Sequence, residues 1–212
     1  MSNTVDIPEY FFYSPSTISI SGATSSGKTF WVKKLLSHKQ TMFKVAPTKV
    51  VFFYGIWQSC YDDMSDVEFV QGLPTDIDAY TDGNNHCIWI IDDLMNEVVN
   101  NKSAEELFTR GSHHKNITVI YINQNIFCQG KCSRTIALNT HYNVLFKNPR
   151  DVEQISRLDR QIGMKGLLKE AYNDAVSTPY GYVVLDLSPH NHSNLKLWTC
   201  ILPDEHHVVY IK

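Results

Sequence analysis

The stretch Gly22-Ala23-Thr24-Ser25-Ser26-Gly27-Lys28-Thr29 fits the pattern G-x-x-x-x-G-K-[ST]. It follows an alternating strand-like run, Thr17–Ser21, and leads into an apolar helix-like run at residues 30–36. Strand, glycine-rich loop and helix in this order are the context in which the pattern forms a phosphate-binding loop. Glycines permit positive φ angles and close approach, while backbone N–H groups and the helix N-terminus supply donors and a positive dipole.

We therefore expect a nucleoside triphosphate to bind here with Mg²⁺. Lys28 is expected to reach the β- and γ-phosphates, and the Thr29 hydroxyl to hold the metal. The alternative is a serine-rich turn that binds no ligand. The residues predicted to bind the nucleotide are Gly22, Ala23, Thr24, Ser25, Ser26, Gly27, Lys28 and Thr29.

Composition indicates a globular chain. The 212 residues suit one domain, which we take as 1–212, and 43% hydrophobic with 19% charged residues argues against disorder. No apolar run approaches the ~18 residues of a membrane span. Residues 1–6 have neither a basic region nor an apolar stretch, so we expect no secretory signal and no secretion.

The five cysteines are expected to be reduced thiols. Cys128 and Cys132 lie four apart with His141 downstream, but a zinc site would need a second close pair, which the sequence lacks. The net charge of -3 does not exclude nucleic acid, because binding needs only a local basic stripe. Such stripes could equally be solvated helix faces; the candidates are Lys33, Lys34, His38 and Lys39, and later Lys147, Arg150, Arg157, Arg160 and Lys165.

Apolar strand-like runs alternate with helix-like segments along the chain. Residues 1–16 are expected to form a lead-in, and 180–187 with 195–202 a C-terminal hairpin. Ser103 and Glu106 fit a capping box that opens a helix through Arg110. Further strands are predicted at 48–54, 67–71, 86–91, 116–122 and 142–146, and further helices at 152–162 and 167–175.

This alternation predicts an α/β fold, with a mostly parallel central sheet covered by helices on both faces. Right-handed crossovers place the carboxyl ends of the parallel strands on one edge, where ligands bind. Residues that carry chemistry are therefore expected to converge there.

Two later strands end in polar side chains. The apolar run from Cys87 to Ile91 ends in Asp92 and Asp93. We expect Asp92 to act on Mg²⁺ and Asp93 to orient and polarise the attacking water. The next strand ends in amides, of which Gln124 is the first choice and Asn123 the second for holding that water or sensing the γ-phosphate. Ordinary turn residues are the alternative for both pairs.

Hydrolysis also needs positive charge on the transferring phosphates, which an arginine from a neighbouring subunit can supply. Arg110 ends the predicted helix before the amide-tipped strand, and Arg134 and Arg150 follow that strand. We rank Arg110 first and Arg134 second as catalytic arginines, with ordinary surface arginines as the alternative.

With these features in order, the chain resembles the additional-strand ATPases of the FtsK–HerA group. It is similar in particular to the genome-packaging ATPases of large eukaryotic DNA viruses, including the poxvirus packaging ATPase and the short versions of Polinton/Maverick elements and adintoviruses. Residues 110–125 resemble the family segment of helix end, strand and sensor glutamine, and 133–151 strengthen the match. The resemblance covers about residues 16–200.

This resemblance implies a P-loop NTPase with a RecA/ASCE-like sheet, working as a hexameric or pentameric ring. Such a ring uses ATP and Mg²⁺ to pump double-stranded DNA into a capsid, where a vertex or portal protein is a further partner. It would act inside the host cell, in the nucleus or a cytoplasmic virus factory, or with the virion. Many related motors carry Glu where Asp93 stands, and the shorter side chain must sit closer to the water.

Two other functions remain open from the sequence. A P-loop nucleoside kinase would have similar length, although thymidine kinases are expected to show a zinc-binding cysteine lid. An NTP-gated assembly scaffold would hydrolyse nucleotide as a timer and pump no DNA.

Overall fold

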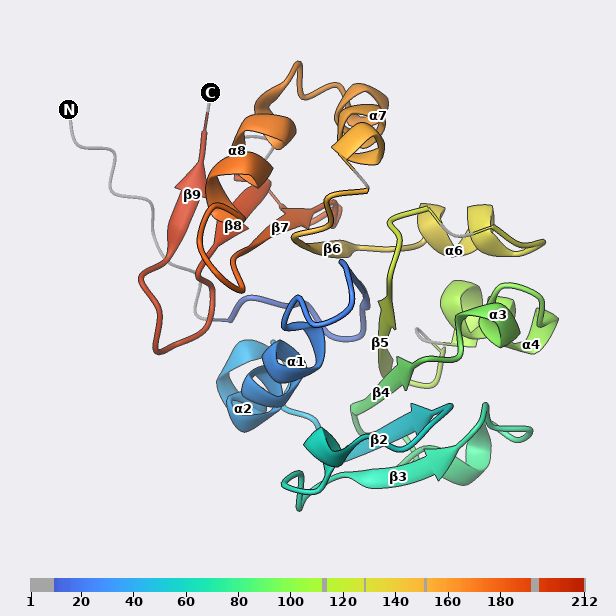
Figure 1. Ribbon diagram of the computed structural model, residues 1–212. Coiled ribbons are helices and arrows are strands. Elements are labelled where there is room, and N and C mark those ends of the chain that lie inside the picture. The colour runs from blue at the N-terminus through green and yellow to red at the C-terminus, as the bar shows by residue number, and fades with distance from the viewer. Residues whose placement is uncertain (1–9, 112–113, 128, 151, 192–194, 212) are drawn as a thin grey trace.

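Figure 1 shows the computed structural model, which describes residues 10–111, 114–127, 129–150, 152–191 and 195–211. Within these ranges nine strands form one sheet in the order β3-β2-β4-β5-β1-β6-β7-β8-β9, with helices on both faces. The strands are β1 (Thr17–Ser21), β2 (Lys49–Tyr54), β3 (Glu68–Gln71), β4 (Cys87–Asp92), β5 (Ile117–Asn123), β6 (Tyr142–Phe146), β7 (Tyr182–Asp186), β8 (Leu197–Thr199) and β9 (Val208–Tyr210).

Helices and short helical turns connect these strands. The α-helices are α1 (Lys28–Ser37), α2 (Lys39–Met42), α3 (Met95–Val98), α4 (Lys102–Glu106), α6 (Ser133–Leu138), α7 (Val152–Ile162) and α8 (Leu167–Ala175). Two 3₁₀ turns span Ser59–Tyr61 and Asp78–Tyr80, and a π-helical turn, Leu107–Gly111, continues α4.

The first six strands of the sheet order pair in parallel, and β7, β8 and β9 extend the sheet beyond β6 by antiparallel pairing. β5 lies between β1 and β4, so the strand before the glycine-rich loop is separated by one strand from the strand that ends in Asp92. The register pairs Ser21 with Asn123 and Asp92 with Ile122. The three strand ends therefore lie side by side on one edge.

The predicted α/β class and mostly parallel sheet are confirmed. The six parallel strands lie within one residue of their predicted bounds, and the predicted C-terminal hairpin exists as β7 and β8. The sequence analysis missed β9, which adds a third antiparallel strand. It also missed α2, α3 and α6, because each is too short to show helical periodicity.

Alternating side chains of the parallel strands fill two cores on opposite faces of the sheet. On β4, Ile88 and Ile90 pack on the α1 side with Leu35, while Trp89 and Ile91 pack on the side of α3, α4 and α6. A strand buried on both faces reads as a continuous apolar run. The third core lies under α7 and α8, against β6, β7 and β8.

The predicted capping box is wrong in its position. The helix begins at Lys102, so Ser103 lies inside the helix, and the Asn101 side chain accepts the N–H of Ala104 at 3.4 Å. Asn101 thus fills the N-cap role that the pattern assigned to Ser103. The predicted helix through Arg110 exists, although its second half is the π-helical turn.

A buried carboxylate ties α7 to α8. Asp159 is 4% exposed and accepts the N–H groups of Gly166 at 2.7 Å and Leu168 at 2.9 Å. Gly166 is the N-cap of α8 and has no side chain that could cap it. The neighbouring helix therefore provides the cap, and negative charge at this terminus also opposes the helix dipole favourably.

Replacing Asp159 by alanine is expected to lower the free energy of unfolding by about 1–3 kcal/mol, because two buried N–H groups lose their acceptor. Urea denaturation of the purified variant would measure this loss. Gln161→Ala, at an exposed and uncharged position of the same helix, should stay within about 0.5 kcal/mol of wild type. Equal stability of the two variants would show that Asp159 does not cap α8.

Candidate functional site

A cavity of about 550 Å³ opens at the carboxyl edge of the parallel strands. We call it the P-loop cavity. Four segments supply its walls: the glycine-rich loop with the start of α1, the residues after β4, the residues after β5, and Gln58 after β2. The predicted site residues that line it are Thr24, Ser25, Lys28, Thr29, Asp92, Asp93, Asn123 and Gln124.

Lys28 folds back across the loop that precedes it. Its Nζ donates to the carbonyl oxygens of Gly22 at 2.7 Å and Ala23 at 2.8 Å. These neutral acceptors hold the ammonium at the wall of the P-loop cavity. A phosphate oxygen at the N-terminus of α1 would be a stronger, charge-assisted acceptor for the same group.

Asp92 is buried beside the start of α1. It is 6% exposed, and its Oδ2 lies 3.5 Å from the Thr29 hydroxyl and accepts the Tyr61 hydroxyl at 2.9 Å. Tyr61 is fully buried in the 3₁₀ turn after β2 and stacks on Phe69 of β3. A rigid aromatic side chain therefore fixes the orientation of the Asp92 carboxylate.

Asp93 has a strained backbone and an exposed side chain. Its φ of 59° lies in the left-handed region, which is costly for most residues and tolerated by Asp and Asn. Gly55, after β2, makes this conformation possible, since a Cβ there would lie 2.7 Å from the Asp93 carbonyl oxygen. The turn directs the chain away from the sheet and leaves Asp93 on the wall of the P-loop cavity.

The two predicted amides differ in environment. Gln124 is exposed on the cavity wall, and its backbone carbonyl oxygen accepts a hydrogen bond from the Asn148 side-chain amide at 2.9 Å. Asn123 is 4% exposed and donates to the Ser19 hydroxyl at 3.3 Å. Its Oδ1 also is buried and has no protein partner among the described residues. Asn123 is thus a buried amide at the wall of the cavity, and Gln124 is an exposed one.

Burial disfavours the charged forms of both Lys28 and Asp92. It lowers the pKa of Lys28, against the attraction of Asp92. It raises the pKa of Asp92, against the hydrogen bond from Tyr61 and the positive charge of Lys28, while Asp93 raises it further. An anionic phosphate beside Lys28 and a cation beside Asp92 would each stabilise the charged form. Shifts of this kind cluster at functional sites.

Thr29 and Asp92 provide the donor types that Mg²⁺ prefers. Both present oxygen atoms to the same cavity at a separation of 3.5 Å. Mg²⁺ is commonly held in this way by one or two protein oxygens together with substrate phosphates and water. The residues therefore fit a magnesium ion bound with a nucleotide.

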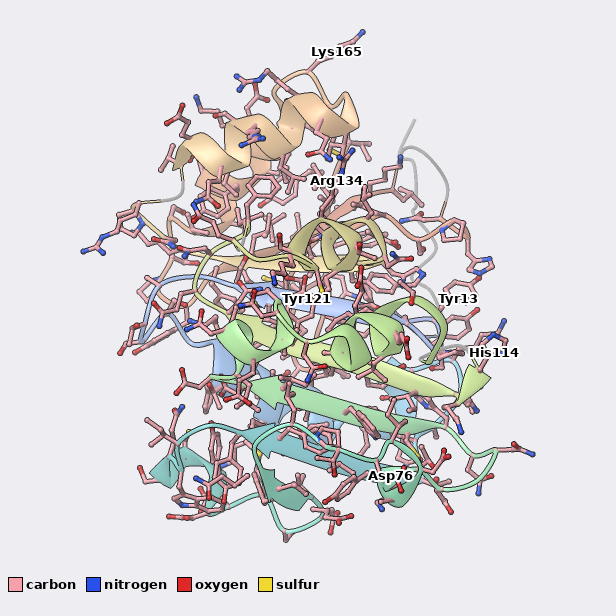
Figure 2. The ribbon with its side chains drawn as sticks, turned by 90° about the vertical axis from the view of Figure 1, so that its right-hand side faces the viewer. Tyr13, Asp76, His114, Tyr121, Arg134 and Lys165 are labelled. Atoms are coloured by element: carbon pink, nitrogen blue, oxygen red, sulfur yellow. The ribbon has the colours of Figure 1, made fainter. Side chains whose placement is uncertain are left out.

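Neither predicted catalytic arginine is found at the P-loop cavity among the described side chains. Arg134 is exposed on α6 and lines a separate small cavity with Tyr121 and Phe127. Figure 2 shows it in the region between α6 and α7. The side chain of Arg110 lies outside the described part of the structure. Neither role is tested, and both remain predictions about a contact with another subunit.

The two basic stripes differ in their ion pairs. Lys33, Lys34 and Lys39, on α1 and α2, form salt bridges with Asp63, Asp204 and Asp66. No salt bridge joins the later stripe to any acidic residue within the described ranges, and Lys165 extends away from the molecule in Figure 2. The exposed members of this later stripe are Lys147, Arg150, Arg157, Arg160 and Lys165.

Sequence reasoning missed three residues of the site. Tyr61, Gln58 and Gly55 all follow β2, in a stretch without a recognisable pattern. Only the fold brings this stretch beside the end of β4, because β2 and β4 pair in parallel. The acid pair itself gave no signal for its aromatic partner.

Two solved structures share the fold over most of this chain. One is B204, the DNA-packaging ATPase from Sulfolobus turreted icosahedral virus, with 13% identity, a TM-score of 0.50 and coverage of 92% of this chain and 97% of that chain. The other is EssC (ATPases 2 and 3) from Geobacillus thermodenitrificans, with 12% identity, a TM-score of 0.50 and coverage of 92% of this chain and 39% of that chain. The fold expected from the resemblance to FtsK–HerA-type ATPases is thereby confirmed.

Sequence comparison adds nothing to this likeness. No model of a known protein family matches the chain, and no curated protein does. Among the described residues, no helix is long and apolar enough to cross a membrane.

Asp92→Asn is expected to stabilise the folded chain in the absence of nucleotide and Mg²⁺. Because burial raises the pKa of Asp92, the folded state binds this proton more tightly than the unfolded state. The resulting stability is fully present below the unfolded pKa of about 3.9 and is lost as pH rises through the raised pKa. Thermal unfolding at about pH 8 should thus show a higher midpoint for the variant.

The difference in unfolding midpoint between variant and wild type should shrink as the pH is lowered through the pKa of Asp92, because the wild-type carboxyl group then becomes neutral too. Glu97→Gln, at an exposed position on the wall of the same cavity, is the matched control and should leave the midpoint nearly unchanged. A lower midpoint for Asp92→Asn at every pH would contradict the prediction.

Proposed function

We propose that this chain is an ATPase that drives double-stranded DNA into a viral capsid. The observation that carries the proposal is the P-loop cavity, where Lys28, at the start of α1, lies with Asp92 and Asp93, at the end of β4. The likeness in fold to the DNA-packaging ATPase of Sulfolobus turreted icosahedral virus supports the choice of substrate and of partner.

In this proposal the triphosphate lies along the glycine-rich loop. Backbone N–H groups of the loop and the N-terminus of α1 bind its oxygens. Lys28 exchanges the carbonyl oxygens of Gly22 and Ala23 for oxygens of the β- and γ-phosphates. The exchange replaces neutral acceptors by charged ones, which strengthens the hydrogen bonds of the ammonium group.

Thr29 and Asp92 hold the Mg²⁺ that accompanies ATP, and the ion supplies positive charge on the phosphates that react. Tyr61 keeps Asp92 in position by donating to its Oδ2 at 2.9 Å. Because this hydroxyl group is buried and close to Asp92, the pKa of Tyr61 is raised. The tyrosine is therefore a neutral hydrogen-bond donor to Asp92.

Asp93 orients the water that attacks the γ-phosphate and accepts its proton. Its carboxylate is exposed on the wall of the P-loop cavity, while that of Asp92 is buried beside Thr29. The two neighbouring acids thus have separate tasks, which their different environments support. Gln124 and Asn123 would bind the same water or the γ-phosphate from the adjacent strand end.

Duplex DNA is the proposed substrate of translocation. The phosphate backbone attracts clustered Lys and Arg side chains. Of the two basic stripes, the one from Lys147 to Lys165 has charges that no described acidic residue pairs with, whereas three lysines of the earlier stripe are paired. We therefore place the contact with DNA on the side of α7.

A ring of identical subunits is the proposed working form. In such a ring Arg110, or failing that Arg134, would reach the γ-phosphate bound by the neighbouring subunit. Arg134 does not line the P-loop cavity of its own chain. This agrees with a role at the cavity of a neighbouring subunit. A capsid vertex or portal protein is the proposed docking partner.

ATP turnover measured with and without duplex DNA tests this function. We expect Mg²⁺-dependent turnover that duplex DNA stimulates and that grows with duplex length, because a translocating motor stays engaged on longer DNA. Lys28→Ala should reduce turnover at least ~100-fold with or without DNA. Turnover that ignores DNA would favour a timer in an assembly scaffold, and phosphate transfer to a nucleoside would favour a kinase.

Asp93→Asn is expected to retain ATP binding and to lose turnover by roughly 10²–10⁴-fold, because the amide cannot accept the proton of the water. Asn tolerates the left-handed conformation that position 93 requires, so the fold should survive. Binding is measured by calorimetry and turnover by phosphate release. Wild-type turnover in this variant would place the general base at another residue.

A further inference from the structure

A second cavity, of about 490 Å³, lies against the other side of the glycine-rich loop. We call it the aromatic cavity. Along the chain, Gly27 and Phe30 line this cavity, while the residues between them, Lys28 and Thr29, line the P-loop cavity. The start of α1 therefore contributes to the walls of both cavities. Their other walls differ, since the aromatic cavity is closed by the end of α8, the start of β7 and the segment from Thr199 to Tyr210.

Two aromatic rings on its wall are unusually exposed. Phe30 is 63% exposed and Tyr180 is 71% exposed. Trp31, Phe146 and Tyr182 form the buried part of the wall beneath them. Exposed aromatic rings at the mouth of a cavity are a characteristic surface for a flat, partly apolar ligand.

The backbone holds Tyr180 in place at a cost. The N–H of Gly181 donates to the Thr178 carbonyl at 3.1 Å, which closes a turn with Pro179 and Tyr180 at its centre. Tyr180 has a φ of 61°, a value that such turns usually assign to Gly or Asn. Strain of this kind in a non-glycine residue is typical of ligand-binding sites.

Close packing leaves this turn little freedom. A Cβ at Gly181 would lie 1.9 Å from the carbonyl oxygen of Ala175, so the turn is packed directly against the end of α8. Tyr180 in turn lies against the glycine-rich loop, since a Cβ at Gly27 would lie 3.0 Å from Tyr180 Cδ1. The ring is thus fixed beside the loop that binds phosphate in the proposed function.

We propose that the aromatic cavity binds the base and ribose of the nucleoside triphosphate, with Tyr180 and Phe30 contacting a purine ring. The inference rests on the proposed function, because the triphosphate in the P-loop cavity determines where the nucleoside must lie. Lys28 and Thr29 line the P-loop cavity and the next residue, Phe30, lines the aromatic cavity, so a nucleotide whose phosphates Lys28 binds would have its nucleoside within reach of the aromatic cavity. Aromatic side chains stack on the face of any purine, so the site should bind a nucleotide more tightly than the same phosphates without a base.

Calorimetric titration with Mg-ATP and with inorganic tripolyphosphate separates the base from the phosphates. Tyr180→Ala should weaken binding of ATP roughly 5–100-fold and leave binding of tripolyphosphate unchanged. Phe30→Ala should act in the same direction. Tyr180→Phe keeps the ring and should bind ATP with wild-type affinity. Leu138 is an exposed apolar residue outside both cavities, so Leu138→Ala should leave the affinity for both ligands unchanged.

The outcomes distinguish this inference from the proposed function. Wild-type protein that binds neither ligand would overturn the nucleotide site, and the base site with it. If the wild type binds ATP and both Tyr180→Ala and Phe30→Ala bind it with the same affinity, only the base site is overturned. A loss in Tyr180→Ala that is the same for tripolyphosphate as for ATP would also overturn only the base site, because a distorted loop would weaken both.

Photolabelling with 2-azido-ATP provides a readout that does not depend on a variant. The reactive azide is attached to the purine, so peptide mapping of irradiated wild-type protein should locate the adduct at Tyr180, Phe30 or another residue of the aromatic cavity. An excess of unlabelled ATP should abolish the adduct. A competed adduct on residues outside this cavity would overturn the inference.

Discussion

The parallel pairing of β1, β5 and β4 is the constraint on which the site depends. Because these strands run in one direction, the glycine-rich loop, Asn123 and Asp92 all follow at the same edge. β5 separates the other two strands, so the loop and the acid start from positions two strand spacings apart, about 10 Å. Side chains then close the interval, with Thr29 Oγ1 reaching 3.5 Å from Asp92 Oδ2.

Several energetic costs are concentrated at this edge of the sheet. Burial penalises the charged forms of Lys28 and Asp92, and Asp93 adds backbone strain. The apolar side chains on both faces of the sheet stabilise the fold enough to tolerate these costs. A bound phosphate beside Lys28 and a cation beside Asp92 would offset the cost of burying these two charges.

Much of the fold could be predicted because most of its parallel strands are apolar runs bounded by turns. The strand ends carried their own signals, in a glycine-rich pattern, an acid pair and an amide pair. Tyr61 carried none, since its partner Asp92 lies on another strand and only pairing of β2 with β4 brings them together. The sequence pattern did not identify Tyr180 either, because its positive φ and its contact with Gly27 are visible only in the structure. Local patterns reveal elements, whereas contacts between distant segments require the fold.

The antiparallel strands beyond β6 have a consequence for binding that the parallel core alone would not produce. β7 runs against β6, so Tyr182 at its start pairs with Phe146 at the end of β6, on the same edge as the glycine-rich loop. The turn before β7 therefore places Tyr180 beside the N-terminus of α1. Consecutive residues of a helix differ by about 100° in direction. One helix start can thus direct Lys28 and Thr29 to one side and Phe30 to the other, which makes a single short element the boundary between two binding cavities.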